Sequence, residues 1–342
     1  MDLYDVIIVG GGPAGLKCAE ILGKSDNRVL LLEKNAVFGD KLCAGGLTRK
    51  DMAMLKVPDH IIEQKICDAT LFSPRNRSLT TTPSPLLFTV NRRALGKWQR
   101  DRLEGSGVRV HAGAQVIRID PETVTLKNGT SYGYRYIVGA DGFASVIRRY
   151  LNLPVKKRLI GIQYTLPAGN VTPMLGIHLN SRLFKSWYAW VFPHRNSMAV
   201  GCCCDPRFMK VSDLRENFHE WLNMQGIDAG NAQLESCPIS YDYRGIRFGN
   251  IFLVGEAAGL ASGLSGEGIY QALVSGQEVA RMIIDPAYEP EALKAVVRFN
   301  TIQNRFMRVL YRAGIFRGLM IELIIWLMNN NRIRNRVSSA FS

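Results

Sequence analysis

The first 33 residues constrain the fold of this chain more than any other stretch. Val6 to Val9 form a short run of β-branched residues, which predicts a buried strand. Three glycines follow at G-x-G-x-x-G spacing, and Pro13 suits the first turn of a helix, where its missing N–H costs nothing. A second apolar run then ends in Glu33. The stretch therefore predicts a strand–helix–strand unit with a glycine-rich turn at its first junction.

Each glycine of this turn has a physical reason to lack a side chain if a dinucleotide binds there. Gly10 allows the tight turn, Gly12 lets a pyrophosphate approach the backbone, and Gly15 lets the helix pack closely on the strand. The helix N-terminus offers free N–H groups to the phosphates. Glu33 is placed to accept hydrogen bonds from ribose hydroxyls, and an acid there argues against a 2′-phosphate. The ligand is then FAD or NAD, and this stretch alone does not choose between them.

Composition narrows the class of protein. The chain has 342 residues, of which 47% are hydrophobic, enough for two domains or one large one. The net charge of +14 suggests an anionic partner, such as nucleic acid, an acidic substrate or an anionic membrane surface. Seven cysteines without a C-x-x-C pair predict neither a disulfide framework nor a metal site. They fit a reducing location on the cytosolic side, and we expect no signal peptide before the first strand.

Two further strand–turn–helix junctions carry glycines. One apolar strand ends in GADG at 139–142, before a basic helix, and could close over the same dinucleotide. Another buried strand, at 251–254, runs into Gly255-Glu256. Gly263, Gly266 and Gly268 then leave backbone amides bare just before a helix expected from Ile269. A helix N-terminus stabilises negative charge, which a reduced flavin carries, so this junction favours FAD over NAD.

The middle of the chain changes character. Residues 157–245 contain strand-like runs and many aromatic residues, as a second sheet would. With period-two alternation, Tyr188, Trp190 and Phe192 share one face of a strand. That face is either the wall of a ligand site or a core face, and the residues alone favour the core. Cys202 to Cys204 point alternately to opposite faces, so we expect them to pack.

Two other segments leave alternatives open. Cys43 lies in a glycine-rich loop after the first unit, and it is either close to the cofactor or a small apolar filler. From residue 290 onward the chain is expected to be helical and basic. Residues 318–328 are apolar except for Glu322 and too short to span a bilayer. They either lie in an anionic membrane interface or pack as a helix on the second domain.

Several motifs together resemble known flavoproteins. GGGPAG with Glu33, GADG at 139–142 and GEAAG at 255–259 resemble the FAD-binding set of the para-hydroxybenzoate-hydroxylase-like flavoproteins. Within that group, KLCAGGL at 41–47, YAWVFP at 188–193 and SGEGI at 265–269 resemble the geranylgeranyl reductase family. Members of this family use FAD to saturate prenyl double bonds. The resemblance extends from the N-terminus to about residue 285.

With this resemblance we expect an α/β fold, α+β overall. It has a Rossmann-like FAD-binding domain (1–70, 90–156 and 246–288), a β-sheet substrate domain (71–89 and 157–245) and a C-terminal helical region (289–342). The implied activity is FAD-dependent reduction of carbon–carbon double bonds in a prenyl-chain small molecule or lipid. The alternatives are an FAD monooxygenase or halogenase of the same fold, or a flavin-binding protein without catalysis.

The expected electron donor, partners and location of the protein follow from the same reasoning. The electron donor is open among NAD(P)H, ferredoxin and a quinol, because no second nucleotide fingerprint is visible. Nucleic acid is not expected as a partner. We expect a cytoplasmic location, peripheral at the inner face of an anionic membrane.

The resemblance also assigns roles to residues of this chain. It implies catalytic roles for Cys43, Tyr188 and Trp190, and substrate contacts for Tyr188, Trp190 and Phe192. No metal ligand is expected. The residues expected to bind the cofactor are Gly10, Gly12, Pro13, Ala14, Gly15, Glu33, Lys34, Cys43, Ala44, Arg92, Val116, Asp141, Gly255, Glu256, Gly266, Glu267, Gly268 and Ile269.

Three positions depart from the family pattern. Glu256 stands where the family has Asp, which is a chemically mild change. Gly263 and Leu264 occupy the place of the usual Pro before the S/T-G-E-G stretch. His194 replaces the Lys that commonly ends the aromatic motif. The last two departures bear on substrate identity and head-group recognition.

Overall fold

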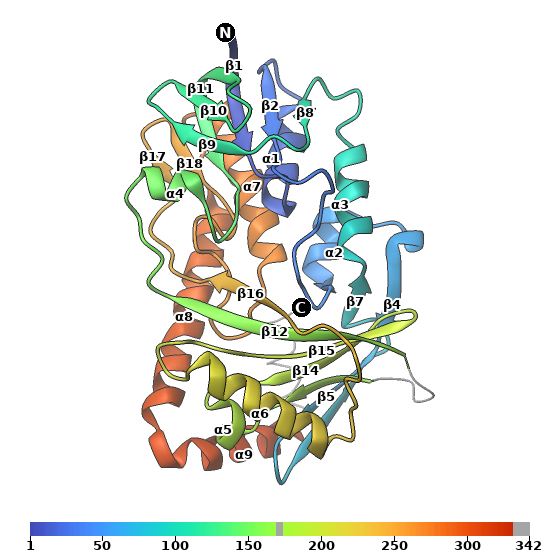
Figure 1. The fold of residues 1–342 in the computed structure, drawn as a ribbon. Helices are drawn as coiled ribbons and strands as arrows, with labels where there is room; N and C mark the ends of the chain where they lie inside the picture. The colour runs from blue at the N-terminus through green and yellow to red at the C-terminus, as the bar shows by residue number, and fades with distance from the viewer. Residues whose placement is uncertain (169–173, 331–342) are drawn as a thin grey trace. The chain divides into compact units, whose positions relative to one another are not determined.

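The structure, a computed structural model, describes residues 1–168 and 174–330 (Figure 1). Its internal contacts divide the chain into two units. The first unit consists of residues 1–40, 92–158 and 239–302, and the second of residues 41–91, 159–238 and 303–342.

The first unit is built around the N-terminal strand–helix–strand segment. Its strands are β1 (Asp2–Val9), β2 (Val29–Leu32), β8 (Arg109–His111), β9 (Val116–Ile119), β10 (Thr123–Leu126), β11 (Ser131–Gly139), β17 (Arg247–Phe248) and β18 (Ile251–Leu253). Its helices are α1 (Pro13–Leu22), α3 (Arg92–Asp101), α4 (Val146–Tyr150) and α7 (Ile269–Ile284), and α8 (Glu291–Arg312) begins in it.

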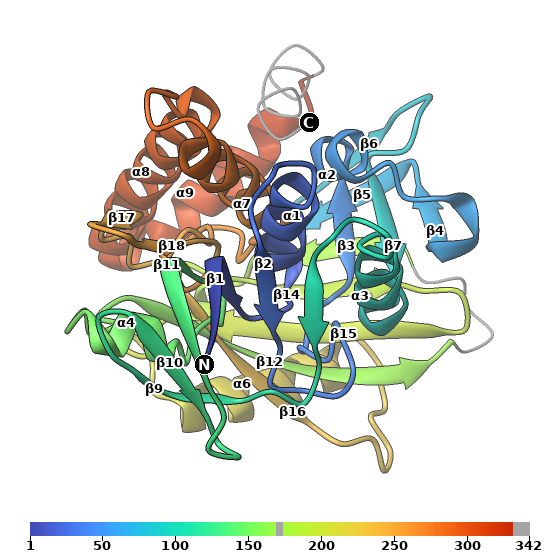
Figure 2. The ribbon, with the colours of Figure 1, turned by 90° about the horizontal axis from the view of Figure 1, so that it is seen from above.

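These strands form a mostly parallel sheet. Among the described residues its order is β17-β18-β11-β1-β2-β8, and β10 joins β9 to β11. Helices α1 and α7 lie side by side (Figure 2), so closely that a Cβ added to Gly276 would lie 2.2 Å from the carbonyl oxygen of Ala14. The buried faces of the two helices join β1 and β2 in one apolar core, which includes Ile8, Leu16 and Val279. The carboxyl ends of β1 and β11 lead into the first two glycine junctions.

The second unit contains the remaining elements. Its strands are β3 (Gly46–Thr48), β4 (Ile62–Ile66), β5 (Asp68–Phe72), β6 (Arg77–Thr81), β7 (Leu87–Val90), β12 (Arg158–Pro167), β13 (Leu175–His178), β14 (Ala189–Pro193), β15 (Ser197–Cys204) and β16 (Glu235–Ser240), the last of which ends at the boundary. Its helices are α2 (Arg49–Leu55), α5 (Ser181–Phe184), α6 (Val211–Met224) and α9 (Arg317–Met328), with short 3-10 turns η1 (Asp59–Ile61) and η2 (Gly314–Phe316).

The large sheet of this unit has the order β16-β12-β15-β14-β13-β5-β6 among the described residues. It is not wholly antiparallel as expected, because β13 pairs with β5 in parallel. Helix α6 crosses one face of the sheet (Figure 1) and buries Phe218 and Trp221 against it. Cys202 and Cys204 lie in that core and Cys203 is also buried, so the three cysteines pack as expected.

The unit boundaries differ from those expected. Residues 41–70 belong to the second unit, because β3 and β4 pair with β7, and β5 pairs with β13. Residues 239–245 join the first unit, where Asp242 meets Arg148. The C-terminal helices do not form a separate region, since residues up to 302 group with the first unit and later ones with the second. These differences arise from pairings between segments far apart in the sequence.

Candidate functional site

The glycine turn after β1 is shaped by close packing. Gly10 has a φ of +110°, and a Cβ added there would lie 2.3 Å from the carbonyl oxygen of Ala140. A Cβ on Gly15 would lie 2.0 Å from the carbonyl oxygen of Gly10. At Gly12, by contrast, no atom of the described residues other than Gly12 and its two chain neighbours lies within 4 Å of the Cβ position. Gly10 and Gly15 are therefore required by the fold itself, whereas Gly12 leaves open space beside the backbone.

That space lies at the N-terminus of α1. Gly12 is the N-cap, no side chain caps the helix, and its first turn carries no acidic residue. Pro13 occupies the first turn and has no N–H to lose, while Ala14 and Gly15 are buried. The first-turn N–H groups have no acceptor within the helix, and the positive end of the helix dipole lies there. The turn is therefore suited to bind an anionic group such as a pyrophosphate.

Glu33 fixes the shape of this turn. Its side chain is buried, and its Oε2 accepts a hydrogen bond from the N–H of Gly11 at 2.5 Å. Its Oε1 accepts from the N–H of Asn35 at 2.9 Å. A carboxylate has about four lone-pair positions, so both oxygens retain capacity for ribose hydroxyls. Lys34 beside it is exposed, and Val116 is buried on β9.

Arg92 provides the strongest test of whether this unit fits FAD. It is the first residue of α3, and its Nε and Nη1 atoms are buried without a hydrogen-bond partner in the described part of the chain. A buried charged donor without an acceptor is costly, and a phosphate supplies the acceptors that a guanidinium binds best. The orphaned guanidinium atoms therefore fit an anionic cofactor.

The other two junctions hold their acidic residues differently. Asp141 accepts a hydrogen bond from the N–H of Val146 at 2.7 Å, and burial raises the pKa of its carboxyl. Glu256 accepts from the N–H of Ser240 at 3.0 Å, and the N–H of Gly255 donates to Ser275 Oγ at 2.8 Å. The longer side chain of Glu256 thus has a defined place in the third junction.

The stretch before α7 presents a second bare helix N-terminus. Gly268 is the N-cap, no side chain caps it, and the first turn, which starts at Ile269, carries no acidic residue. Ser262 organises the loop before it, because its Oγ accepts from the N–H groups of Leu264 and Ser265, and its own N–H donates to the carbonyl of Glu267. A serine-based turn therefore shapes the segment that lacks the usual Pro, and the helix end remains suited to negative charge.

The aromatic strand of the second unit separates two faces. Ala189 and Val191 of β14 pack in the core with α6, whereas Tyr188, Trp190 and Phe192 are half-buried on the opposite face. The three aromatic residues therefore share one face, as their spacing predicted, but this face is not the α6 core. The Tyr188 and Trp190 rings meet edge to face, with centroids 5.9 Å apart.

Glycines make room for these rings. A Cβ on Gly201 would lie 2.5 Å from Trp190 Cζ2, and a Cβ on Gly46 would lie 2.6 Å from Phe192 Cε1. Trp190 also approaches Gln163, with 3.4 Å between Nε1 and Oε1. The face is thus an apolar, aromatic surface, and the glycines next to it carry no side chain that would displace the rings.

His194 follows β14 and holds the loop that carries Cys43. Its Nδ1 lies 2.5 Å from Glu63 Oε2, and its Nε2 lies 3.0 Å from the carbonyl oxygen of Ala44. Both neighbours offer acceptor oxygens, so either ring nitrogen can donate a hydrogen bond. A Cβ on Gly45 would lie 2.7 Å from the ring, so the loop passes directly beside it. His194 therefore holds this loop in place through the Ala44 carbonyl.

The thiol of Cys43 is exposed, whereas Cys18 and Cys202 to Cys204 are buried. It accepts a hydrogen bond from the N–H of Gly45 at 3.4 Å. Cys43 and Ala44 belong to the second unit, and residues 266–269 belong to the first. A joint contact of these two segments with the flavin ring remains a prediction.

Comparison with known proteins decides the cofactor. Residues 3–172 match the family described as the FAD binding domain. The chain is an FAD-binding flavoprotein. The predicted cofactor, the α/β fold class and the assignment to FAD-dependent oxidoreductases are confirmed.

Relatives of this flavoprotein bear out the predicted resemblance. A geranylgeranyl diphosphate reductase from Rhodobacter capsulatus is 26% identical over 81% of this chain and 74% of its own length. A digeranylgeranylglycerophospholipid reductase from Methanocaldococcus jannaschii is 25% identical over 87% of this chain and 82% of its own. A geranylgeranyl bacteriochlorophyll reductase-like protein from Thermoplasma acidophilum has the same fold, with a TM-score of 0.80 and 21% identity over 97% of this chain and 92% of that protein.

One residue of the flavoprotein's first unit escaped sequence reasoning. Arg148 is 2% exposed, and its guanidinium donates to the carbonyl oxygens of Ala257 at 3.0 Å and Asp242 at 2.8 Å. It also pairs with the Asp242 carboxylate at 3.5 Å. Arg148 thereby ties the turn of the third junction to α4. The sequence showed only a basic helix, which gives no sign that one arginine points inward.

Proposed function

We propose that this flavoprotein saturates isolated carbon–carbon double bonds in a prenyl chain. The observation that carries the proposal is the aromatic face of Tyr188, Trp190 and Phe192, which lies opposite the α6 core with glycines beneath it. A prenyl chain offers few polar handles, so an enzyme binds it by burying apolar area, at about 25 cal/mol per Å². The names of the relatives, which are reductases of geranylgeranyl compounds, support the same substrate class.

Bound FAD, once reduced by the electron donor, would supply the hydride for this reaction. An isolated alkene has no carbonyl to polarise it, so a proton must be delivered to one carbon as the other receives the hydride. We assign the proton delivery to Cys43, either directly from its exposed thiol or through a water that the thiol holds. His194 would fix the position of the Cys43 loop through the Ala44 carbonyl. Tyr188 and Trp190 would hold the alkene in place, and fixed positioning lowers the barrier.

The test is an anaerobic single turnover. The flavin-loaded protein is reduced with dithionite and mixed with a prenyl diphosphate or a prenylated lipid. We expect flavin reoxidation together with the gain of one hydrogen pair per reduced bond by mass spectrometry. Trp190→Ala should slow the turnover, whereas Trp98→Ala, on α3 of the first unit, is the matched control. Productive reoxidation only when oxygen is present would replace the reductase by a monooxygenase or halogenase. The absence of any turnover would favour a flavin-binding protein without catalysis.

Two further parts of the proposal concern partners. The electron donor is to be identified among NADH, NADPH, reduced ferredoxin and a quinol by mixing each with the oxidised protein under anaerobic conditions. We also propose that the protein works at the periphery of an anionic membrane. None of the helices in residues 1–168 and 174–330 is long and apolar enough to cross a membrane.

A further inference from the structure

Helix α9 lacks the polar outer face of an ordinary surface helix. Its only charged residues are Arg317, which is 9% exposed, and Glu322, which is half-buried. Glu322 accepts hydrogen bonds from Ser73 Oγ at 2.6 Å and Asn76 Nδ2 at 2.8 Å. A surface helix normally turns its apolar stripe inward and its charges outward. Here both charges are used inside the second unit, so the outer face of α9 is left without a charge.

The outer face is instead a continuous apolar ridge. Leu319, Leu323 and Trp326 are 62%, 54% and 60% exposed, and they recur at the spacing of one helix face. Ile315 and Phe316 of η2 continue the row, at 90% and 61% exposed. We call these five residues the apolar ridge. Exposed apolar patches of this kind mark surfaces that contact a partner or a membrane.

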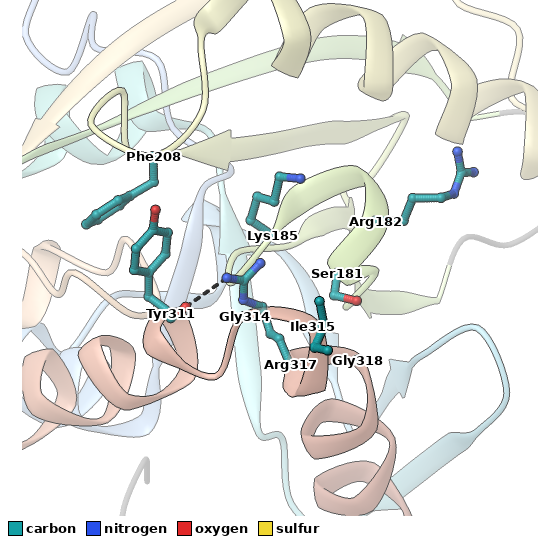
Figure 3. Close-up of a pocket in the computed structure, with 9 residues that line it drawn as sticks. All are labelled: Ser181, Arg182, Lys185, Phe208, Tyr311, Gly314, Ile315, Arg317 and Gly318. Carbon is teal, nitrogen blue, oxygen red and sulfur yellow. Dashed lines mark hydrogen bonds between the residues drawn. The ribbon is translucent and has the colours of Figure 1, made fainter.

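A basic pocket adjoins the η2 end of the ridge. Its volume is about 500 Å³, and it is lined by Lys185, Arg317, Tyr311 and Ile315 among others (Figure 3). None of the described residues that line it is acidic. Arg182 at its rim extends away toward α6, where it pairs with Glu220 (Figure 3).

Two cations of this pocket have donors to spare. Lys185 Nζ has no partner in the described part of the chain. Arg317 donates through Nε to the carbonyl of Leu310 at 3.1 Å and through Nη2 to that of Tyr311 at 2.9 Å, which holds the guanidinium in place. Its Nη1 makes no hydrogen bond with the described residues. Both side chains line the same pocket, and a guanidinium and an ammonium are groups that bind phosphate.

The charges around the ridge have one sign. Arg305, Arg308 and Arg312 are exposed on α8, and none of them is ion-paired with a described residue. Between residues 303 and 330 Glu322 is the only acidic residue, and it points inward. The surface therefore complements an anionic partner.

The dimensions of α9 decide how it meets a bilayer. Its 12 residues extend for about 18 Å, whereas the hydrocarbon core is about 30 Å thick. The helix therefore lies along the membrane rather than through it. Trp326 suits the interface, where the indole contacts both lipid and water.

We propose that the apolar ridge and the adjoining basic pocket form a docking surface for an anionic phospholipid membrane. The ridge enters the interface, and Lys185 and Arg317 bind the phosphate of a lipid headgroup. This inference deepens the proposed peripheral location, but it needs neither turnover nor a prenyl substrate.

The test uses the full-length, oxidised flavoprotein in a vesicle flotation assay. Vesicles of phosphatidylcholine alone are compared with vesicles that also contain phosphatidylglycerol, at low and high salt. We expect binding to the anionic vesicles that weakens as salt rises. The double variant Leu323→Gln/Trp326→Gln should lose at least about tenfold in binding, because the apolar burial is removed. Lys185→Gln should lose about fivefold, the equivalent of about 1 kcal/mol for one basic residue near the surface.

Ile302→Gln is the matched control, because Ile302 is 56% exposed on α8 but lies outside the ridge. It should bind like the wild type. Tryptophan fluorescence of the wild type should shift to the blue with anionic vesicles and be quenched by brominated lipid, and the ridge variant, which lacks Trp326, should lose this change.

Three results would overturn the proposal. They are no binding to anionic vesicles at low salt, equal binding by the ridge variant and the control, and a ridge variant that converts a dimer into a monomer without changing vesicle binding. The last result would assign the ridge to a second copy of the chain. Failure of the reductase proposal is seen separately, as missing turnover in a protein that still binds vesicles.

Discussion

Gly12→Val should separate folding from cofactor binding in this flavoprotein. The backbone of Gly12 has a φ of −76° and a ψ of 179°, a conformation open to any residue, and its Cβ position meets no atom within 4 Å. The fold therefore tolerates the side chain, and the free energy of unfolding should fall by no more than about 1 kcal/mol through the changed N-cap. The added methyl groups occupy the space through which a pyrophosphate reaches the N-terminus of α1.

The expected loss of affinity follows from the contacts that are blocked. Two charge-assisted hydrogen bonds from backbone N–H groups to the phosphates are worth about 1.5–3 kcal/mol each. Their loss should raise the Kd for FAD by about 10² to 10⁴-fold. The assay is titration of flavin-free protein with FAD, followed by flavin fluorescence, alongside thermal unfolding of the same samples.

Gly15→Ala is the control that should fail differently. Its Cβ would lie 2.0 Å from the carbonyl oxygen of Gly10, so helix and strand must move apart and the fold itself should be lost. A Gly12→Val protein that binds FAD with the wild-type Kd would refute the placement of the pyrophosphate. A Gly12→Val protein as unstable as Gly15→Ala would refute the claim that this space is open.

The remaining predictions concern buried charges of the first unit. Arg92→Met should weaken FAD binding by roughly thirtyfold, about 2 kcal/mol, as measured by titration with FAD. It should also stabilise the flavin-free protein against denaturant, because it removes a buried guanidinium that has no hydrogen-bond partner for its Nε and Nη1 among the described residues. Asp242→Ala should cost about 3–5 kcal/mol in denaturant unfolding, because it leaves the buried Arg148 without its carboxylate, and a loss below about 1 kcal/mol would contradict this. Burial raises the pKa of the Asp141 carboxyl above its ordinary value of 3.8, so folding takes up a proton there. The stability of the flavin-free protein should therefore fall as the pH rises from 3.8 through the raised pKa of the folded state. Asp141→Asn should remove this part of the pH dependence, and an unchanged pH dependence in that variant would contradict the assignment.

The sequence alone predicts much of the first unit. The strand, glycine turn and helix from Val6 to Leu22 follow from local requirements, because a tight turn, an open N-terminus and an apolar period are written in adjacent residues. The shared face of Tyr188, Trp190 and Phe192 follows likewise from the period of a strand. The cofactor class was predicted for the same reason, since the residues that shape a phosphate turn are contiguous.

Only the tertiary structure decided which distant segments meet. Residues 41–70 join the second unit through strand pairing with β7 and β13, and a pairing partner is not encoded in the strand's own residues. Arg148 points inward because acceptors from other segments meet its guanidinium, and Glu322 turns away from solvent because donors from another segment meet its carboxylate. The sequence determined the helices of the C-terminal region but not which side of α9 would be covered. A helix period shows only that two faces differ, whereas the neighbours that pack on one of them decide which face is left for a partner.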